Sequence, residues 1–282
     1  MERLEAHRAF FADLITTIAG VPKSRLTSAF GTTPRERYFD PGPWEVFTGR
    51  GYIQTPSDDP AFLYQDIVVG LAAESNINNG QPALHAVCLA ALNLEEGETV
   101  VHIGAGAGYY SAVLAKLTGP TGKVFSYEIE PTLAAKATRN LADLPNVTVY
   151  QRSGAEGALP DCKIIYVNAG ATGPLDIWLD ALRLGGRLLV PITPDAIGEA
   201  PGAGAILMVT HAAEQRFDAR FLMPVMFIPC IGARDRETAK SLTVAFKRGD
   251  SGKVRSLRRK TPPDETCWCS GTNWWLSTCA SV

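Results

Sequence analysis

The 282-residue sequence lacks any apolar run close to the roughly 18–20 residues that a membrane-spanning helix needs. Its first residues, MERLEAHRAFFADLI, carry acidic side chains and lack the basic start, apolar centre and small-residue cleavage site of an export signal. Lys and Arg number 27 against 29 Asp and Glu, so a net charge of −2 offers no general attraction for nucleic acid or anionic lipid. These absences predict a cytoplasmic protein without a membrane partner, and they disfavour a nucleic-acid partner.

The six cysteines are scattered along the chain, and three of them lie in apolar stretches typical of buried thiols. Cys267 and Cys269 form a CWC segment, but no second Cys or His pair at zinc-binding spacing accompanies it. We therefore expect reduced thiols and no metal site.

Between about Gly80 and Thr193, strand-like and helix-like segments alternate. Five runs are nearly continuous apolar strands of the kind that crossover helices bury on both faces: ETVVHIGA, KVFSYEI, VTVYQ, CKIIYVNAGA and GRLLVPIT. Apolar residues three and four positions apart mark helices in GYYSAVLAKL, PTLAAKATRNLADL and PLDIWLDALRL. The alternation predicts an α/β fold with a parallel, doubly wound sheet, whose ligand should lie beyond the carboxyl ends of the strands.

The flanking segments differ from this pattern. Residues 1–79 begin with helical spacing in LEAHRAFFADLI and continue as Pro- and Gly-rich loops and short strands, which predicts a cap. Between Gly202 and Gly232 we expect an antiparallel hairpin that closes one edge of the sheet. After it, the sequence predicts a short helix over RDRETAKSL and a β-hairpin around the turn at Gly249–Gly252.

The strongest single feature is VVHIGAGAGYY, where a strand runs into three closely spaced glycines and then a helix. Such a turn lets the backbone approach a ligand, and the helix behind it offers free N–H groups. The third glycine follows the first by four residues (108 − 104 = 4), one fewer than the dinucleotide fingerprint requires. The spacing therefore favours the turn of S-adenosylmethionine enzymes. The candidate cofactor-binding residues are Gly104, Ala105, Gly106, Gly108 and Tyr109.

The next predicted strand, KVFSYEIE, ends in a carboxylate at Glu128, twenty residues beyond Gly108 (128 − 108 = 20). At this place a carboxylate can accept hydrogen bonds from both ribose hydroxyls of a nucleoside cofactor. Alternatively, Glu128 and Glu130 are solvated residues at a strand end. The preceding glycine turn favours ribose binding by Glu128, with Ile129 as a further cofactor contact.

Several segments, in order, resemble the protein-L-isoaspartate O-methyltransferase family: TPRERYFDPGPW, LYQDIVVG, QPALHAVCLAAL, VVHIGAGAGYYSAVLAKLTGPTGKVFSYEIE and IIYVNAGATGPLDIWLDALRLGGRLLVPIT. The resemblance covers about Pro34 to Thr193. It implies a Rossmann-like, seven-stranded class I methyltransferase sheet that binds S-adenosylmethionine. Around it we expect an N-terminal cap and substrate-side segment over residues 1–79, the cofactor-binding domain over 80–232, and a C-terminal extension over 233–282.

Two departures from the family's pattern concern the cofactor. His102 stands where the family has an acidic residue, and it either orients the glycine turn or is a packed neutral histidine. Ser153 and Gly154 replace the family's Asp-Gly at the adenine edge, so Ser153 is expected to accept a weaker hydrogen bond from the adenine amine. Asn168, at the end of the fourth strand, is carried over as a further cofactor-binding residue.

The third departure is in the loop NINNGQP, where the family keeps a serine beside the reacting carboxylate. Depending on the alignment, that position falls on Asn78 or Gly80, and neither carries a hydroxyl. A carboxylate is already a competent nucleophile, so methyl transfer to it requires alignment rather than a base. The amide of Asn78, Asn79 or Gln81 can donate an orienting hydrogen bond, and we expect Asn78 and Asn79, with Asp66, to be the catalytic residues. The alternative is a plain turn and helix cap.

Two neighbours of the loop carry weaker predictions. Tyr64 and Asp66 either line the substrate side or belong to an exposed loop. His85, on the helix that follows, is expected to be packed rather than catalytic.

The segment Lys247–Lys260 contains seven basic residues and one acid, which we interpret as a solvated face rather than a nucleic-acid contact. Near the end, Trp268, Trp274 and Trp275 should pack the tail onto the domain or line a cleft.

The resemblance predicts an S-adenosylmethionine-dependent O-methyltransferase that acts on a carboxylate of a protein or peptide. A methyltransferase of the same fold that modifies a small molecule or a specialised peptide is the alternative. A binding module without enzymatic activity is a third, weaker reading.

Overall fold

The computed structural model describes residues 2–194 and 202–281. The chain forms two compact units. The first consists of residues 1–98 and 105–152, and the second of residues 99–104 and 153–282. These units cut across the boundaries expected at residues 79 and 232, so the three-part division stays a prediction.

The first unit contains most of the helices and three pairs of short strands. Its helices are α1 (Glu2–Ile18), α2 (Arg25–Gly31), α3 (Pro82–Leu92), α4 (Tyr109–Thr118) and α5 (Pro131–Asn140), with 3-10 turns η1 (Arg35–Tyr38), η2 (Pro60–Leu63) and η3 (Ala73–Ser75). Antiparallel pairing joins β1 (Glu45–Phe47) to β2 (Tyr52–Gln54) and β3 (Gly70–Ala72) to β4 (Ile77–Asn78). Parallel pairing joins β6 (Lys123–Glu128) to β7 (Val147–Gln151), as the sequence predicts.

Local sequence explains where these helices begin. Glu130 accepts a hydrogen bond from the Leu133 N–H at 2.7 Å, and Pro131 occupies the first turn of α5.

On α1, Phe11 and Ile15 lie one turn apart and are fully buried. Burial of one such side chain stabilises the fold by about 1.5–3 kcal/mol, which holds α1 against the unit.

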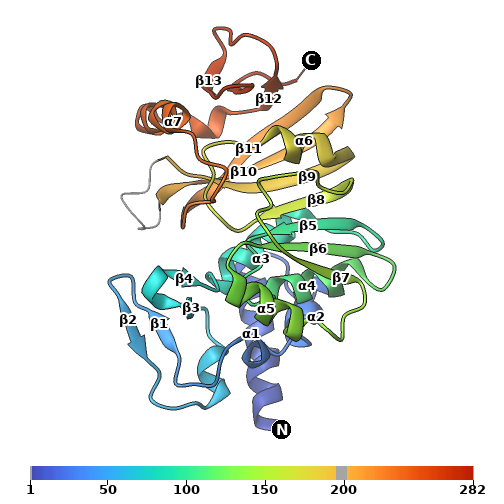
Figure 1. Ribbon diagram of the computed structural model, residues 1–282, viewed down its shortest axis with the longest axis vertical. Coiled ribbons are helices and arrows are strands. Elements are labelled where there is room, and N and C mark those ends of the chain that lie inside the picture. Colours follow the sequence, from blue (N-terminus) through green and yellow to red (C-terminus); the bar gives the residue numbers. More distant parts are fainter. Residues whose placement is uncertain (1, 195–201, 282) are drawn as a thin grey trace. The chain divides into compact units, whose positions relative to one another are not determined.

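The second unit is built around a mixed sheet (Figure 1). Its strands are β5 (Thr99–Ile103), β8 (Cys162–Val167), β9 (Leu182–Ile192), β10 (Gly202–Ala213), β11 (Arg216–Phe227), β12 (Ser256–Arg259), β13 (Cys267–Ser270) and β14 (Trp274–Ser277). They follow one another in the order β5, β8, β9, β10, β11, β12, β14, β13. The helices are α6 (Asp176–Ala181) and α7 (Arg236–Arg248), with a 3-10 turn η4 (Ser251–Lys253).

Pairing within this sheet changes from parallel to antiparallel at β9. Strands β5, β8 and β9 are parallel, whereas β10, β11, β12, β14 and β13 pair antiparallel. The parallel strands are buried on both faces, as their apolar sequences predict. The result is the α/β methyltransferase fold class expected from the sequence.

Two predictions about this unit need correction. The β10–β11 hairpin exists, but it does not close the edge, because β12 pairs with β11 at Phe217 and Leu257. Helix α6 is shorter than PLDIWLDALRL, since β9 already begins at Leu182.

The predicted hairpin around Gly249–Gly252 is wrong. Helix α7 continues to Arg248 and buries Ala239, Leu242 and Ala245 on one face. Gly249, with φ of +85°, ends this helix. The hairpin of the extension lies later, between β13 and β14.

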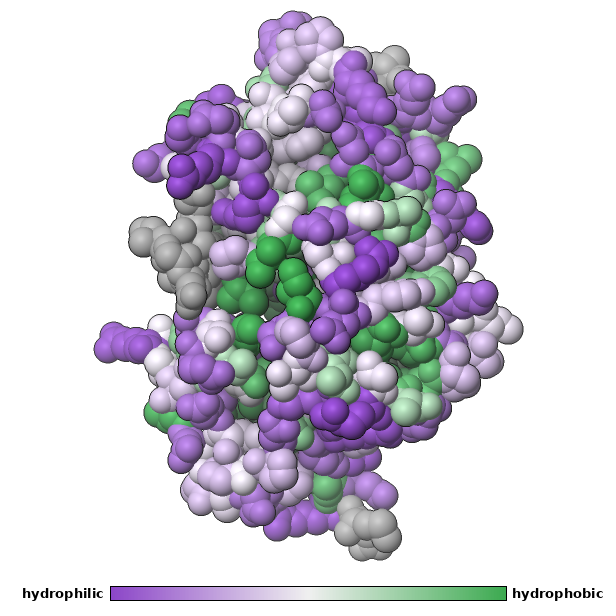
Figure 2. Space-filling model, in the orientation of Figure 1, coloured by the Kyte–Doolittle hydropathy of each residue, from purple (hydrophilic) through white to green (hydrophobic). Residues whose placement is uncertain are grey.

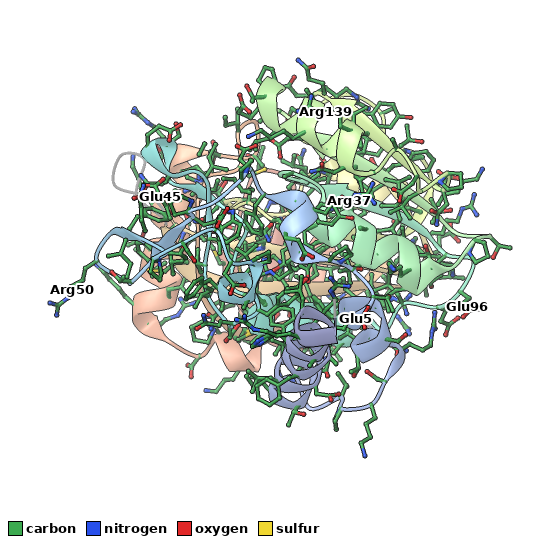
Figure 3. The ribbon with its side chains drawn as sticks, turned by 90° about the horizontal axis from the view of Figure 1, so that it is seen from below. Glu5, Arg37, Glu45, Arg50, Glu96 and Arg139 are labelled. Carbon is green, nitrogen blue, oxygen red and sulfur yellow. The ribbon has the colours of Figure 1, made fainter. Side chains whose placement is uncertain are left out.

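The surface is polar over most of the face shown in Figure 2, and the C-terminal extension at the top of that view presents mainly hydrophilic side chains. In the first unit, Arg50 lies in the turn between β1 and β2 and extends away from the ribbon (Figure 3). Among the described residues, every helix is too short or too polar to cross a bilayer.

Candidate active site

The glycine turn connects β5 to α4 and has the backbone conformation that its sequence predicts. Gly104, Gly106 and Gly108 have φ angles of +78°, +56° and +98°, in the region that residues with side chains avoid. A Cβ atom on Gly108 would lie 2.8 Å from Leu141 Cδ1, so space also requires glycine there. A Cβ atom on Gly106 would lie 3.1 Å from Leu71 Cδ1. The sequence analysis missed Leu71, because nothing in its own segment marks its approach to a turn 35 residues later (106 − 71 = 35).

Glu128 lies at the end of β6 and turns its carboxylate toward the glycine turn. Its Oε2 accepts a hydrogen bond from the Gly106 N–H at 2.7 Å, and its Oε1 accepts one from the Glu130 N–H at 3.0 Å. The residue is only 7% exposed. Burial raises the pKa of Glu128, and the backbone N–H donors oppose that rise because they stabilise the carboxylate. The structure thus brings Glu128 and Gly106 together.

Three other residues predicted to bind the cofactor in the first unit differ in placement. Ala105 is buried, and its N–H donates to the Tyr127 carbonyl at 3.1 Å. Ile129 is 42% exposed. Tyr109 is fully buried and packs edge to face against Tyr38, with ring centroids 5.5 Å apart. The Tyr109 side chain therefore anchors the start of α4 in the core, which favours a structural role over the predicted cofactor contact.

The amides of Asn78 and Asn79 have different surroundings. Asn78 Oδ1 accepts a hydrogen bond from the Gly80 N–H at 2.9 Å, and its Nδ2 donates to the Asn76 carbonyl at 3.2 Å. Asn79 is only 7% exposed, and its Nδ2 has no hydrogen-bond partner among the described residues. A buried donor without a partner costs about 1–3 kcal/mol. Of the two, Asn79 therefore has a donor to offer to a ligand.

Gly80 is required by the packing of His85. The imidazole ring of His85 stacks on the phenol ring of Tyr110 with centroids 3.7 Å apart, and His85 is buried. A Cβ atom on Gly80 would lie 2.1 Å from His85 Nε2, and Gly80 has φ of +67°. A hydroxyl-bearing side chain cannot occupy this position. The expectation that His85 is packed is confirmed.

Asp66 holds the loop onto the start of α3. Its Oδ2 accepts a hydrogen bond from Gln81 Nε2 at 2.8 Å, and its Oδ1 accepts one from the Ala83 N–H at 2.7 Å. Both carboxylate oxygens are thus engaged at a helix N-terminus, where a carboxylate is stabilising. This geometry favours a positioning role for Asp66; a direct catalytic role stays a prediction.

Tyr64 belongs to a buried network rather than to an exposed loop. Its hydroxyl accepts hydrogen bonds from Arg8 Nε at 3.0 Å and from the Arg35 N–H at 3.2 Å, and it donates to Glu36. Burial raises the pKa of Tyr64 to about 12. Its hydroxyl is committed to holding α1 and η1.

In the second unit, His102 and Asn168 form a buried pair. Asn168 Nδ2 lies 2.8 Å from His102 Nε2, and Asn168 Oδ1 is buried without a partner among the described residues. Burial lowers the pKa of His102 to about 3, so the imidazole is neutral and its Nε2 accepts the amide proton. A Cβ atom on Gly104 would lie 3.4 Å from the Asn168 carbonyl. The neutral, packed histidine therefore orients Asn168.

Ser153 and Gly154 lie in the same unit. Ser153 Oγ accepts a hydrogen bond from the Ala155 N–H at 3.1 Å, and the Gly154 carbonyl accepts one from Trp178 Nε1 at 2.8 Å. A Cβ atom on Gly154 would come within 2.7 Å of Ile103 Cγ1 at the end of β5. Glycine is needed for this close approach.

Comparison with known proteins identifies related chains. A family model described as Protein-L-isoaspartate(D-aspartate) O-methyltransferase (PCMT) matches residues 43–235. A Brucella anthropi protein-L-isoaspartate O-methyltransferase is 30% identical over 217 residues, which cover 76% of this chain and 88% of that protein. An Ignicoccus hospitalis protein of the same description is 34% identical over 181 residues, 62% of this chain and 82% of that protein.

Solved structures agree on the fold. A protein-L-isoaspartate O-methyltransferase structure superposes with a TM-score of 0.65 at 22% identity, covering 85% of this chain and 69% of that chain. A Plasmodium falciparum structure of the same description, in complex with S-adenosyl-L-homocysteine, has a TM-score of 0.63 at 16% identity, covering 80% of this chain and 98% of that chain. At these identities the similarity shows a common fold.

Proposed function

Because the chain belongs to the protein-L-isoaspartate O-methyltransferase family, we propose that it transfers a methyl group from S-adenosylmethionine to a carboxylate of a protein or peptide. The observation that carries the proposal is the contact of the Glu128 carboxylate with the Gly106 N–H in a turn of three positive-φ glycines. The free, mostly buried cysteines support a reducing compartment, and we propose the cytoplasm as the place of action.

The residues present fit the cofactor. A carboxylate can accept about four hydrogen bonds, and the N–H groups of Gly106, Ile129 and Glu130 already engage Glu128, so its carboxylate keeps capacity for a ribose hydroxyl. Asn168 Oδ1 is buried and lacks a partner within residues 2–194 and 202–281, so it is an acceptor that a bound ligand can satisfy. We infer that these residues, with the glycine turn and Ser153, hold the cofactor. When bound, the cofactor supplies a methyl group on a positively charged sulfur.

The protein's part in the transfer is alignment of the acceptor. An ionised carboxylate attacks without a base, so no residue has to remove a proton. The Asn79 Nδ2 donor is buried and has no partner in the part of the chain that the structure describes, so it is suited to orient one acceptor oxygen. Asn78 and Asp66 are suited to hold the loop, because their polar atoms already bind Gly80, Asn76, Gln81 and Ala83. Donation by an amide would replace the serine hydroxyl of the resembling family.

The test uses the full chain, radiolabelled methyl donor and two peptides that differ only in an isoaspartyl or an aspartyl residue. We expect a methyl ester on one of the two peptides. The ester is recognised by its release in mild alkali, because a carboxyl ester hydrolyses there whereas N-methyl groups persist. Methyl transfer that survives alkali would assign a different acceptor atom. Cofactor binding without transfer to either peptide would favour a small-molecule or specialised peptide acceptor, for which the extension beyond residue 235 is the supporting observation.

A further inference from the structure

The C-terminal extension adds strands to the sheet outside the part of the chain that the family model matches. The match ends at residue 235, and α7 and β12–β14 follow it. Strand β12 pairs with β11, and β14 pairs with β12 from Ser256–Ser277 to Arg259–Trp274. The extension is therefore a continuous part of the second unit's sheet.

Trp274 of this extension packs against the loop that follows β8. A Cβ atom on Gly173 would lie 2.1 Å from Trp274 Cζ2, and one on Gly271 would lie 2.6 Å from the same ring. The indole edge thus lies against two glycines, one from the family-matched segment and one from the extension. Trp274 is 9% exposed, so nearly all of the ring is enclosed.

Charged groups fix the extension at this position. Arg259 of β12 reaches Asp176 Oδ1 at 2.6 Å and Asp180 Oδ1 at 2.7 Å on α6, and the Arg259 side chain is 12% exposed. Asn273 Nδ2 donates to Asp176 Oδ2 at 2.9 Å. Because Asp176 binds both β12 and the residue before Trp274, the indole is held in register with the β8 loop.

A cavity of about 240 Å³ lies where these segments meet. Its walls are residues 172–176 after β8, residues 232–235 with Thr238 at the start of α7, and residues 272–274 of the extension. Ligand sites for whole small molecules measure roughly 300–1,000 Å³. This cavity is smaller than that range, and its volume matches a single amino-acid side chain better than a complete nucleoside cofactor.

The cavity lies at the carboxyl side of the parallel strands. Thr172 follows the cofactor candidate Asn168 by four residues on the same loop (172 − 168 = 4). Hydrogen bonds from the Gly170 N–H to the Ile228 carbonyl at 2.7 Å and from the Cys230 N–H to the Gly170 carbonyl at 2.8 Å join this loop to the segment after β11. Ligands of open α/β sheets bind at this edge.

We propose that this cavity binds one side chain of the acceptor peptide, and that Trp274 determines which side chains are accepted there. The inference rests on the proposed methyl transfer to a peptide. It assigns acceptor choice to a side chain outside the family-matched segment, whereas the glycine turn and Glu128 serve the cofactor.

The test compares wild type with Trp274→Ala and Gly271→Ala, which remove and displace the indole. The matched control is Trp275→Phe on the same strand, because Trp275 faces elsewhere and donates to Thr261 at 3.2 Å. Each protein is saturated with S-adenosylhomocysteine, and a panel of isoaspartyl peptides with Gly, Leu or Trp as flanking residue is titrated calorimetrically. Turnover on the same peptides and the Kd of the cofactor are measured in parallel.

We expect Trp274→Ala to change the ratio of Kd values between the Trp and Gly peptides by about tenfold. Gly271→Ala should change this ratio by less, and Trp275→Phe should leave the ratio unaltered. The cofactor Kd should be unchanged in all three variants. An unchanged ratio in Trp274→Ala, or no peptide binding to wild type, overturns the inference. Weaker cofactor binding in Trp274→Ala, with an unchanged ratio of the peptide Kd values, also overturns the inference. Peptide binding without methyl ester instead refutes the proposed function and leaves the cavity assignment standing.

Discussion

Glu128 in the first unit and His102 in the second are both buried, and burial drives both toward the neutral form. It raises the pKa of Glu128 and lowers the pKa of His102. Their surroundings then diverge. The Gly106 and Glu130 N–H groups donate to the Glu128 carboxylate, which favours the charged form, whereas Asn168 donates to a His102 nitrogen that must be unprotonated. Similar burial thus serves a charged ligand-binding group in one unit and a neutral positioning group in the other.

The largest expected effect tests the neutral form of His102. Its folded pKa of about 3 lies below the ordinary histidine pKa of 6.5, so between these values the unfolded state binds more protons. Stability should therefore fall as pH falls from 6.5 toward 3, by up to about 1.4 kcal/mol per pH unit. Urea unfolding at several pH values should show a shallower fall for His102→Gln. Equal slopes in the two proteins would mean that His102 is not held neutral.

The charged form of Glu128 is tested by cofactor affinity. Glu128→Ala should weaken S-adenosylmethionine binding about 100-fold, because hydrogen bonding of the ribose to a charged acceptor is lost. Glu128→Gln keeps the shape of the side chain and half of its acceptor capacity, so its cofactor Kd should lie between those of wild type and Glu128→Ala. Calorimetric Kd values measure both. A variant that binds as tightly as wild type would remove Glu128 from the cofactor site.

Asn79 adds a third case, an uncharged buried amide whose Nδ2 has no hydrogen-bond partner among the described residues. Asn79→Leu should lower kcat about tenfold with the cofactor Kd unchanged, and it should raise the free energy of unfolding because an unpartnered buried donor is removed. The control Asn78→Ala should lower stability, since it breaks the contacts with Gly80 and Asn76. Chemical unfolding and steady-state kinetics separate the two. Loss of stability in Asn79→Leu would contradict the role of a free donor.

The smallest effect is the pH dependence that Glu128 adds to stability. Because its folded pKa is raised, the native state binds more protons than the unfolded state just above the usual Glu pKa, so stability should decrease as pH rises through that window. This slope is opposite in sign to that of His102. The difference between wild type and Glu128→Gln isolates it, and a slope of the same sign as for His102 would rule it out.

The strands and the glycine turn could be predicted because their information is local. Apolar runs mark β5, β6, β8 and β9, and the spacing of Gly104, Gly106 and Gly108 marks the turn. The predicted hairpin at Gly249 failed because glycine serves both turns and helix ends. Leu242 and Ala245 already carried the helical spacing that a longer window would have followed. The family's segments identified the fold correctly.

The loop could be predicted only as a position. Asn78 and Asn79 are chemically identical, and their difference arises from which amide the fold satisfies. Likewise, Gly80 gave no sign that it accommodates His85. Trp274 and Gly173 are 101 residues apart (274 − 173 = 101), so no local pattern indicates their contact. Roles that depend on which polar atoms find hydrogen-bond partners, or on contacts between segments distant in sequence, can be assigned only from the three-dimensional structure.

The long sequence separation of Gly173 and Trp274 also affects the order in which the chain folds. In the sheet, β9, β10, β11 and β12 lie between β8 and β14. Contacts this distant in sequence form late, because a long loop must close first. Acceptor discrimination should therefore be the last property to appear during refolding and the first to vanish under mild denaturant, while cofactor binding persists.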